Sequence, residues 1–142
     1  MCRLLRLVKK EVADYDLEHV SFEGFQQPKP YYERASILLL TSEYEGFLLV
    51  LAECMSFGVI PVVYDSYSAV RDIIDDGKDG VVILYEKNGY DADKAACMLA
   101  QIMQNDFLRD MMAHAAIEKI KVYSVERIYQ EWMKTFGKLL LY

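Results

Sequence analysis

Cysteine and long apolar runs are both scarce in this sequence. The three cysteines of the 142 residues, Cys2, Cys54 and Cys97, form no C-x-x-C pair. The sequence therefore supports neither a zinc ribbon nor a disulfide framework, and a reducing, cytoplasmic compartment is expected. No apolar stretch approaches the roughly 18 residues that span a bilayer. The first residues, MCRLLRLVKKEVADYD, lack the apolar core of a signal peptide.

Basic blocks and metal-ligand spacings are missing as well. The net charge is −6, whereas a nucleic-acid reader usually presents a basic face, so nucleic acid is not an expected partner. An acidic chain repels anions at long range, so any phosphate site has to be local and built from backbone N–H groups. We expect no metal and no resident cofactor, and we expect His19 and His114 to be structural.

What the sequence does contain is a regular alternation of strand and helix patterns. Short apolar runs predict strands at His19–Phe22, Ser36–Leu40, Val59–Tyr64 and Val81–Tyr85. Helical patterns lie near residues 3–12, 31–35, 47–57, 66–74, 91–104, 106–121 and 124–140. This order predicts an α/β fold, a Rossmann-like parallel sheet with helices on both faces. The continuous apolar run at Ser36–Leu40 predicts a strand buried on both faces.

The length fits one domain over residues 1–142, and the front of that domain looks incomplete. The chain opens on a helix that no strand precedes, so we expect the first βα unit of the sheet to be absent. Loss of that unit should expose a sheet edge and apolar helix faces, and we predict dimerisation or aggregation through that surface.

The segment TSEYEGFLLVLAECMSFG, at positions 41–58, carries the predicted chemistry. It follows the carboxyl end of a strand, where ligands collect in open α/β sheets. The first N–H groups of the following helix lack partners inside that helix, and the helix dipole adds partial positive charge there. This end is therefore suited to a diphosphate. The predicted anion site comprises Gly46, Phe47, Leu48, Leu49 and Val50.

Two glutamates flank this helix start. The apolar neighbours of Glu53 predict a buried helix, in which a carboxylate has to be paired or hydrogen-bonded. Helical side chains lean toward the N-terminus, so Glu53 can point back toward Glu45, and the two could accept hydrogen bonds from sugar or ribose hydroxyls. The alternative is that Glu45 is a solvated loop acid or a helix-capping residue, while a core tyrosine or lysine satisfies Glu53.

Five ordered motifs resemble the retaining, GT-B-fold glycosyltransferases, in particular family 4. Glu45 to Glu53 resembles the E-x7-E signature of that family. The other matches are VSFEGF at positions 20–25, the YY-to-TS stretch at 31–42, GVIPVV at 58–63 and IIDDGKDG at 73–80. Three departures are mild: Cys54 replaces the usual alanine, Ser68 a common glycine, and Asp72 the usual glutamate. The larger departure is that we find no counterpart of the family's first strand in this domain, with its glycine-rich turn and its arginine–lysine pair for the diphosphate.

The resemblance implies a specific site and reaction. It implies that Glu45 is the catalytic residue, contacting donor sugar hydroxyls near the reacting carbon, and that Glu53 holds the ribose hydroxyls. The backbone around Phe47 to Val50 would meet the diphosphate, and the turn from Phe22 to Gly24 would lie near the base. The chain would be part of the C-terminal, donor-binding domain of a hexosyltransferase that uses a UDP- or GDP-linked sugar, without its N-terminal acceptor domain.

Partners and rival functions follow from the same resemblance. A glycan or lipid-linked acceptor is implied, in a bacterial surface-polysaccharide pathway, with the whole enzyme cytoplasmic and peripheral at the inner face of the membrane. The fragment alone is expected to be inactive. The alternatives are a sugar-nucleotide epimerase of the same fold class, a flavodoxin-like or receiver domain, and a non-catalytic nucleotide-binding or interaction domain.

Overall fold

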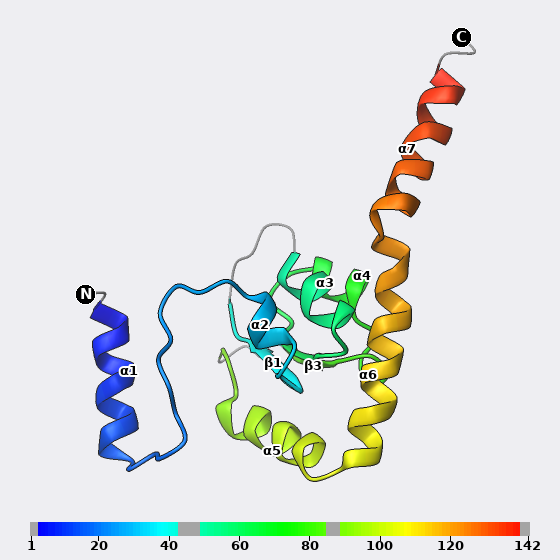
Figure 1. Cartoon of the computed structure of the whole chain (residues 1–142). Coiled ribbons are helices and arrows are strands. Elements are labelled where there is room, and N and C mark those ends of the chain that lie inside the picture. Colours follow the sequence, from blue (N-terminus) through cyan, green and yellow to red (C-terminus); the bar gives the residue numbers. More distant parts are fainter. Residues whose placement is uncertain (1–2, 43–48, 85–88, 140–142) are drawn as a thin grey trace.

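Three parallel strands form one open sheet in this chain, whose computed structural model describes residues 3–42, 49–84 and 89–139. The strands β1 (Ile37–Leu40), β2 (Ile60–Tyr64) and β3 (Val81–Ile83) lie in that order across the sheet (Figure 1). Ile37 pairs with Ile60, and Val62 pairs with Val81. Because each parallel pair needs a crossover connection, the order confirms the predicted α/β class.

The helices of the described residues match the predicted positions within a few residues. Before the central strand lie α1 (Arg3–Asp14), α2 (Lys29–Tyr32) and α3 (Leu49–Ser56). After it lie α4 (Ala69–Ile73), α5 (Ala92–Met103), α6 (Asp106–Ile120), a 3-10 turn η1 (Lys121–Tyr123) and α7 (Val125–Leu139). Polar caps fix two starts: Asp91 Oδ1 accepts from Lys94 N at 2.9 Å, and Asn105 Oδ1 from Leu108 N at 3.0 Å.

Apolar side chains cover both faces of the sheet, as the sequence predicts. Val63 and Val82 lie in one buried cluster with residues of α3, α4 and α6. Val62, Tyr64 and Ile83 lie in a second cluster with residues of α5 and α6. All five residues of β2 are buried. The central strand is therefore the part of the sheet that both layers of helices hold in place.

Gly58 ends α3 and turns the chain directly into β2. Its φ is +74°, a conformation that favours glycine. Gly58 N donates to Met55 O at 3.0 Å, and Val59 N donates to Cys54 O at 3.1 Å. This pair of bonds is the Schellman arrangement, which satisfies the last carbonyls of a helix. The predicted C-cap glycine is confirmed.

The segment between α4 and β3 is a hydrogen-bonded turn that packs under the central strand. Asp76 Oδ1 accepts from Val82 N at 2.8 Å, and Gly77 has a φ of +75°. A Cβ on Gly80 would lie 2.8 Å from Pro61 Cγ and 2.9 Å from Pro61 O. Glycine is therefore required at position 80 by lack of space, and both predicted Asp-Gly turns have a structural role.

Two expectations about the first strands are wrong. His19–Phe22 is not a strand; Val20 and Phe22 are exposed, and no neighbouring strand in the described residues pairs with this segment. The strand β1 is only partly buried, and Leu39 is 44% exposed, because β1 pairs with β2 alone among the described strands. A strand forms only where a partner accepts its backbone hydrogen bonds, and the sequence of one segment does not reveal that partner.

The helices at either end of the described chain contribute no buried residue. In Figure 1, α1 stands apart from the sheet and α7 projects away from it. Neither α1 nor α7 buries a side chain, although both carry an apolar stripe that includes Leu4 and Trp132. Among residues 3–42, 49–84 and 89–139, no helix is both long and apolar enough to cross a bilayer.

Candidate functional site

The carboxyl ends of the three strands are tied together by short polar bonds. Ser66, which follows β2, donates its hydroxyl to Ser42 O, which follows β1, at 2.8 Å. Asp65 N donates to Ile83 O of β3 at 2.8 Å. This edge of an open parallel sheet is where ligands bind in such folds, so these residues mark the edge at which a ligand is expected.

Arg71 lies at this edge and forms an ion pair with Asp65. Its Nη2 and Nε atoms donate to Asp65 Oδ2 at 2.6 and 3.0 Å. The hydrogen bonds to Asp65 raise the pKa of Arg71 above its ordinary value. The guanidinium therefore neutralises the Asp65 carboxylate and is not available as an unpaired positive charge.

Glu53 lies on an exposed face of α3, so the prediction of a buried carboxylate is wrong. The helix buries Leu51, Cys54 and Met55, whereas Leu49 is 61% exposed and Glu53 is exposed. An apolar composition alone predicts burial all round, but only one side of α3 contacts the sheet. The side chain of Glu53 is therefore accessible from the solvent.

The side chain that Glu53 contacts is Tyr32 of α2. The Tyr32 hydroxyl donates to Glu53 Oε2 at 3.4 Å. Tyr32 is the core tyrosine that the alternative interpretation of Glu53 required. Glu53 Oε1 has no hydrogen bond within the part of the chain that the structure describes. The carboxylate therefore keeps one oxygen open to a ligand.

Tyr32 itself is held firmly in the core. It is 9% exposed and clusters with Leu51 and Cys54, and its ring lies 5.8 Å from that of Phe57 between centroids. Burial, followed by the negative charge of Glu53, raises the pKa of Tyr32 above the usual value for a phenol. The hydroxyl is thus a neutral hydrogen-bond donor at physiological pH.

A cavity of about 370 Å³ lies beside Tyr32, at the turn that contains Gly24. Gly24 has a φ of +70°, and the space beside its Cα is open. Gln26 Nε2 donates to Glu23 O at 2.9 Å, and Tyr31 Oη donates to Glu23 Oε2 at 3.4 Å, so the turn is internally bonded. The cavity is lined by Ser21, Glu23, Gly24, Gln26, Pro28, Tyr31 and Tyr32.

Phe22 does not join this cavity, although the sequence grouped it with Gly24. Its ring lies under the ammonium of Lys9, 5.2 Å from Nζ to the ring centroid. Tyr32 thus links the two predicted regions, since it lines the cavity with Gly24 and bonds Glu53, whereas Phe22 lies beside α1. No role of Tyr32 was predictable from the sequence alone; the YY pair at positions 31–32 was the available signal.

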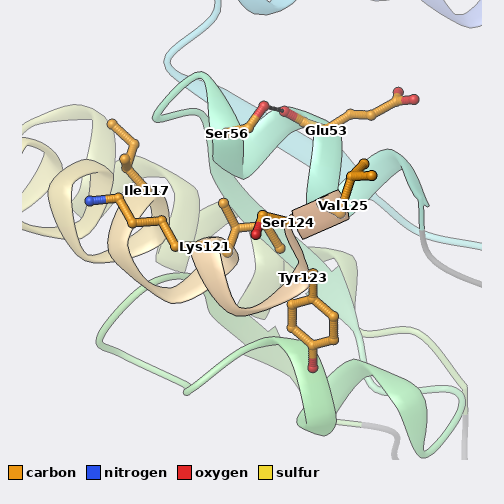
Figure 2. A pocket seen from close by; sticks show the side chains of 9 residues that line it. Glu53, Ser56, Ile117, Lys121, Tyr123, Ser124 and Val125 are labelled. Atoms are coloured by element: carbon orange, nitrogen blue, oxygen red, sulfur yellow. Dashed lines mark hydrogen bonds between the residues drawn. The ribbon is translucent and has the colours of Figure 1, made fainter. Parts of the chain in front are cut away.

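A second hollow, about 510 Å³ in volume, separates α3 from the start of α7 (Figure 2). Glu53 and Ser56 line it from α3, and Lys121 and Val125 line the opposite wall. Figure 2 shows the Glu53 carboxylate and the Lys121 ammonium extending in opposite directions. The walls are mostly apolar, and no sequence motif indicated this hollow.

The remaining predicted site residues are only partly described. Leu49 and Val50 are the first two residues of α3, and Val50 packs against the core. Glu45, Gly46, Phe47 and Leu48 lie outside the described residues, so their predicted roles stay predictions. Within the described ranges, no three His, Cys, Asp or Glu side chains gather as metal ligands would.

An open parallel sheet with helices on both faces belongs to the Rossmann-like class of folds, in which ligands bind at the carboxyl edge of the sheet. Residues 5–119 match the family model "Glycosyl transferases group 1". The chain therefore belongs to the group 1 glycosyl transferase family. That assignment goes against the epimerase and receiver-domain alternatives.

Two curated relatives illustrate the range of the family. The amylovoran biosynthesis glycosyltransferase AmsD of Erwinia amylovora is 29% identical over 129 residues, covering 91% of this chain and 34% of the relative. The poly(ribitol-phosphate) alpha-N-acetylglucosaminyltransferase of Staphylococcus aureus is 30% identical over 133 residues, covering 92% of this chain and 26% of the relative. The chain thus spans about a third or less of these relatives.

Solved structures share the fold. TarM is 28% identical and superimposes with a TM-score of 0.78, over 92% of this chain and 26% of TarM. The pneumococcal O-GlcNAc transferase GtfA, solved with UDP and GlcNAc, gives a TM-score of 0.80 at 22% identity, over 95% of this chain and 27% of GtfA. The likeness to GtfA concerns the fold alone. Together they confirm the GT-B type of α/β architecture.

Proposed function

We propose that this chain forms the nucleotide-sugar-binding half-site of a retaining, family 4 hexosyltransferase. The observation that carries the proposal is that the open carboxylate of Glu53 is bonded to Tyr32, which also lines the cavity at Gly24. In the proposed arrangement, Glu53 accepts hydrogen bonds from the ribose hydroxyls, and the base occupies the cavity at the Gly24 turn. A UDP- or GDP-linked sugar is the donor.

The proposed chemistry is transfer of a hexose to an acceptor hydroxyl with retention at the anomeric carbon. Negative charge develops on the leaving diphosphate, and N–H groups at the start of α3 stabilise it there. Glu45 contacts the donor sugar near the reacting carbon. We propose no resident metal or cofactor for these steps. Because an acceptor has to be positioned by a second domain, this segment alone is expected to have no transferase activity.

The acceptor and setting are proposed from the names of the relatives. One relative is named for amylovoran biosynthesis and another for transfer to poly(ribitol-phosphate). A glycan or lipid-linked acceptor in bacterial polysaccharide assembly fits both names. The enzyme would act in the cytoplasm, peripheral to the inner face of the membrane, and an N-terminal acceptor domain would complete the cleft.

The open side of β1 supports the proposal that a further βα unit belongs to this sheet. Leu39 is 44% exposed on that strand, and α1 buries no residue. When no such unit covers this surface, we propose self-association of the chain through it. Size-exclusion chromatography with light scattering tests this: Leu39→Lys should shift the wild-type oligomer toward monomer, and an unchanged oligomer would contradict the proposed surface.

Nucleotide binding tests the proposed donor site directly. Isothermal titration of the chain with UDP and with GDP should show binding of at least one, and Glu53→Ala should weaken it by roughly 10- to 100-fold, as for a hydrogen bond to a charged group. Glu11→Ala is the matched control, since Glu11 is an exposed helical glutamate on the distant α1. Absence of binding by the folded chain would favour an interaction role instead.

A further inference from the structure

We infer that Tyr32 is a positioning residue that orients the Glu53 carboxylate toward the nucleotide. The inference rests on the proposed function, because it assigns a role to the partner of the proposed ribose-binding group. Tyr32 lines the cavity at Gly24 that is proposed for the base, and the role inferred here concerns its hydroxyl, which acts through Glu53. Its hydroxyl bonds Oε2 of Glu53 and leaves Oε1 for the ribose.

The need for such a residue follows from the exposure of Glu53. An exposed glutamate on a helix samples several side-chain rotamers, and each unproductive rotamer lowers the affinity for a ligand that needs one of them. No cation pairs with Glu53 within the described ranges of the chain, and Figure 2 shows Lys121 turned the other way. The Tyr32 hydroxyl is therefore the polar group that restricts this carboxylate.

Tyr32 has the rigidity that a positioning residue requires. Its ring is fixed by Phe57 and by the core beneath α3, and α2 anchors its backbone, with Tyr32 N donating to Pro28 O at 3.1 Å. The 3.4 Å bond is long for an O–H···O pair, so it restricts the Glu53 carboxylate without locking it. A modest effect on binding is expected.

The neighbouring residue provides a matched control. Tyr31 is adjacent in sequence and lines the same cavity at Gly24, but its hydroxyl contacts Glu23, also at 3.4 Å. Tyr31→Phe and Tyr32→Phe therefore each delete one hydroxyl with the same bond length to a glutamate. They differ in which glutamate loses its donor, and both keep an aromatic ring in place.

The experiment is isothermal titration of wild type, Tyr31→Phe, Tyr32→Phe, Glu53→Ala and the Tyr32→Phe/Glu53→Ala double variant. Each is titrated with UDP, GDP and their 2′,3′-dideoxy forms. We expect Tyr32→Phe to weaken ribonucleotide binding by roughly 3- to 10-fold, the effect of one ordinary hydrogen bond. It should leave dideoxynucleotide binding unchanged and add nothing in the Glu53→Ala background. Tyr31→Phe should leave the preference for ribose unchanged.

The outcomes separate the inference from the function on which it rests. If folded wild type binds neither UDP nor GDP, the proposed function is wrong and the role of Tyr32 is lost with it. If wild type prefers ribose while Tyr32→Phe behaves like Tyr31→Phe, only the positioning role is wrong. A loss in Tyr32→Phe that is equal for ribo- and dideoxynucleotides, or that persists without Glu53, would also overturn the positioning role. Thermal melts confirm that each variant is folded.

Discussion

Lys119 on α6 donates a hydrogen bond to Asp75 Oδ1 at 2.8 Å and so ties α6 to the turn that follows α4. Both side chains are partly exposed, at 25% for Lys119 and 44% for Asp75. The hydrogen bond from Lys119 lowers the pKa of Asp75, and that to Asp75 raises the pKa of Lys119. This pair holds the Asp-Gly turn against the helical layer.

Lys119→Met should lower the stability of the chain at neutral pH. Because the folded state depresses the pKa of Asp75, the contribution of the pair is fully present above the unfolded value of about 3.9. It is lost as the pH falls through the folded value. Urea denaturation should therefore show a difference from wild type at pH 7 that shrinks below pH 4. Lys121→Met is the control, since Lys121 forms a surface pair with Glu118 that contributes little.

Asp79→Asn should raise the stability of the chain at neutral pH, opposite to the effect of Lys119→Met. Asp79 is fully buried; its Oδ1 accepts from Asp75 N at 2.9 Å, and its Oδ2 has no partner within the described residues. Burial raises the pKa of Asp79, so the folded wild type gains stability as the pH falls through that raised value. The stability advantage of Asp79→Asn over wild type should therefore be largest at pH 7 and should shrink as the pH falls toward 4. A pH-independent difference would contradict this account.

Alanine substitutions at two glycines should change stability in opposite directions. Gly80→Ala places a Cβ 2.9 Å from the backbone oxygen of Pro61, and it should destabilise by about 1–3 kcal/mol, as overpacking does. Gly137 lies within α7 and has open space around it, so Gly137→Ala should stabilise by about 0.5–1 kcal/mol. Equilibrium urea unfolding measures both, and a Gly80→Ala variant as stable as wild type would disprove the packing argument.

The two described cysteines should differ sharply in reactivity toward Ellman's reagent. Cys97 is exposed and Cys54 is buried, and burial raises the pKa of Cys54 to about 12. Since the thiolate is the nucleophile, Cys54 should be almost unreactive at pH 8 while the chain is folded. In a Cys2→Ser background, one thiol should react promptly and the second only after unfolding. Adding Cys97→Ser should abolish the prompt reaction, and prompt labelling that remains would contradict the burial of Cys54.

The order of elements could be predicted from sequence because each depends on local signals. The run VIPVVY, positions 59–64, is apolar throughout and becomes the buried β2. Gly58 was predictable as a helix end because few other residues tolerate its positive φ. The Asp-Gly turns were predictable in the same way. The strand expected at His19–Phe22 failed because its partner is not specified by its own residues.

Contacts between distant positions were beyond sequence reasoning. The exposure of Glu53 depends on which side of α3 meets the sheet, and an apolar composition does not distinguish the sides. The Tyr32–Glu53 bond joins residues 21 positions apart, and the Lys119–Asp75 bond joins residues 44 apart. Such pairs are fixed by the packing of α2 and α6 on the sheet, which no local pattern encodes.

The way Gly58 joins α3 to β2 determines which end of that helix can adapt. Val59 N donates to Cys54 O, and β2 is buried along its whole length, so the C-terminal turn of α3 is held against a fully buried strand. The opposite end of the helix is less constrained, since Leu49 is 61% exposed.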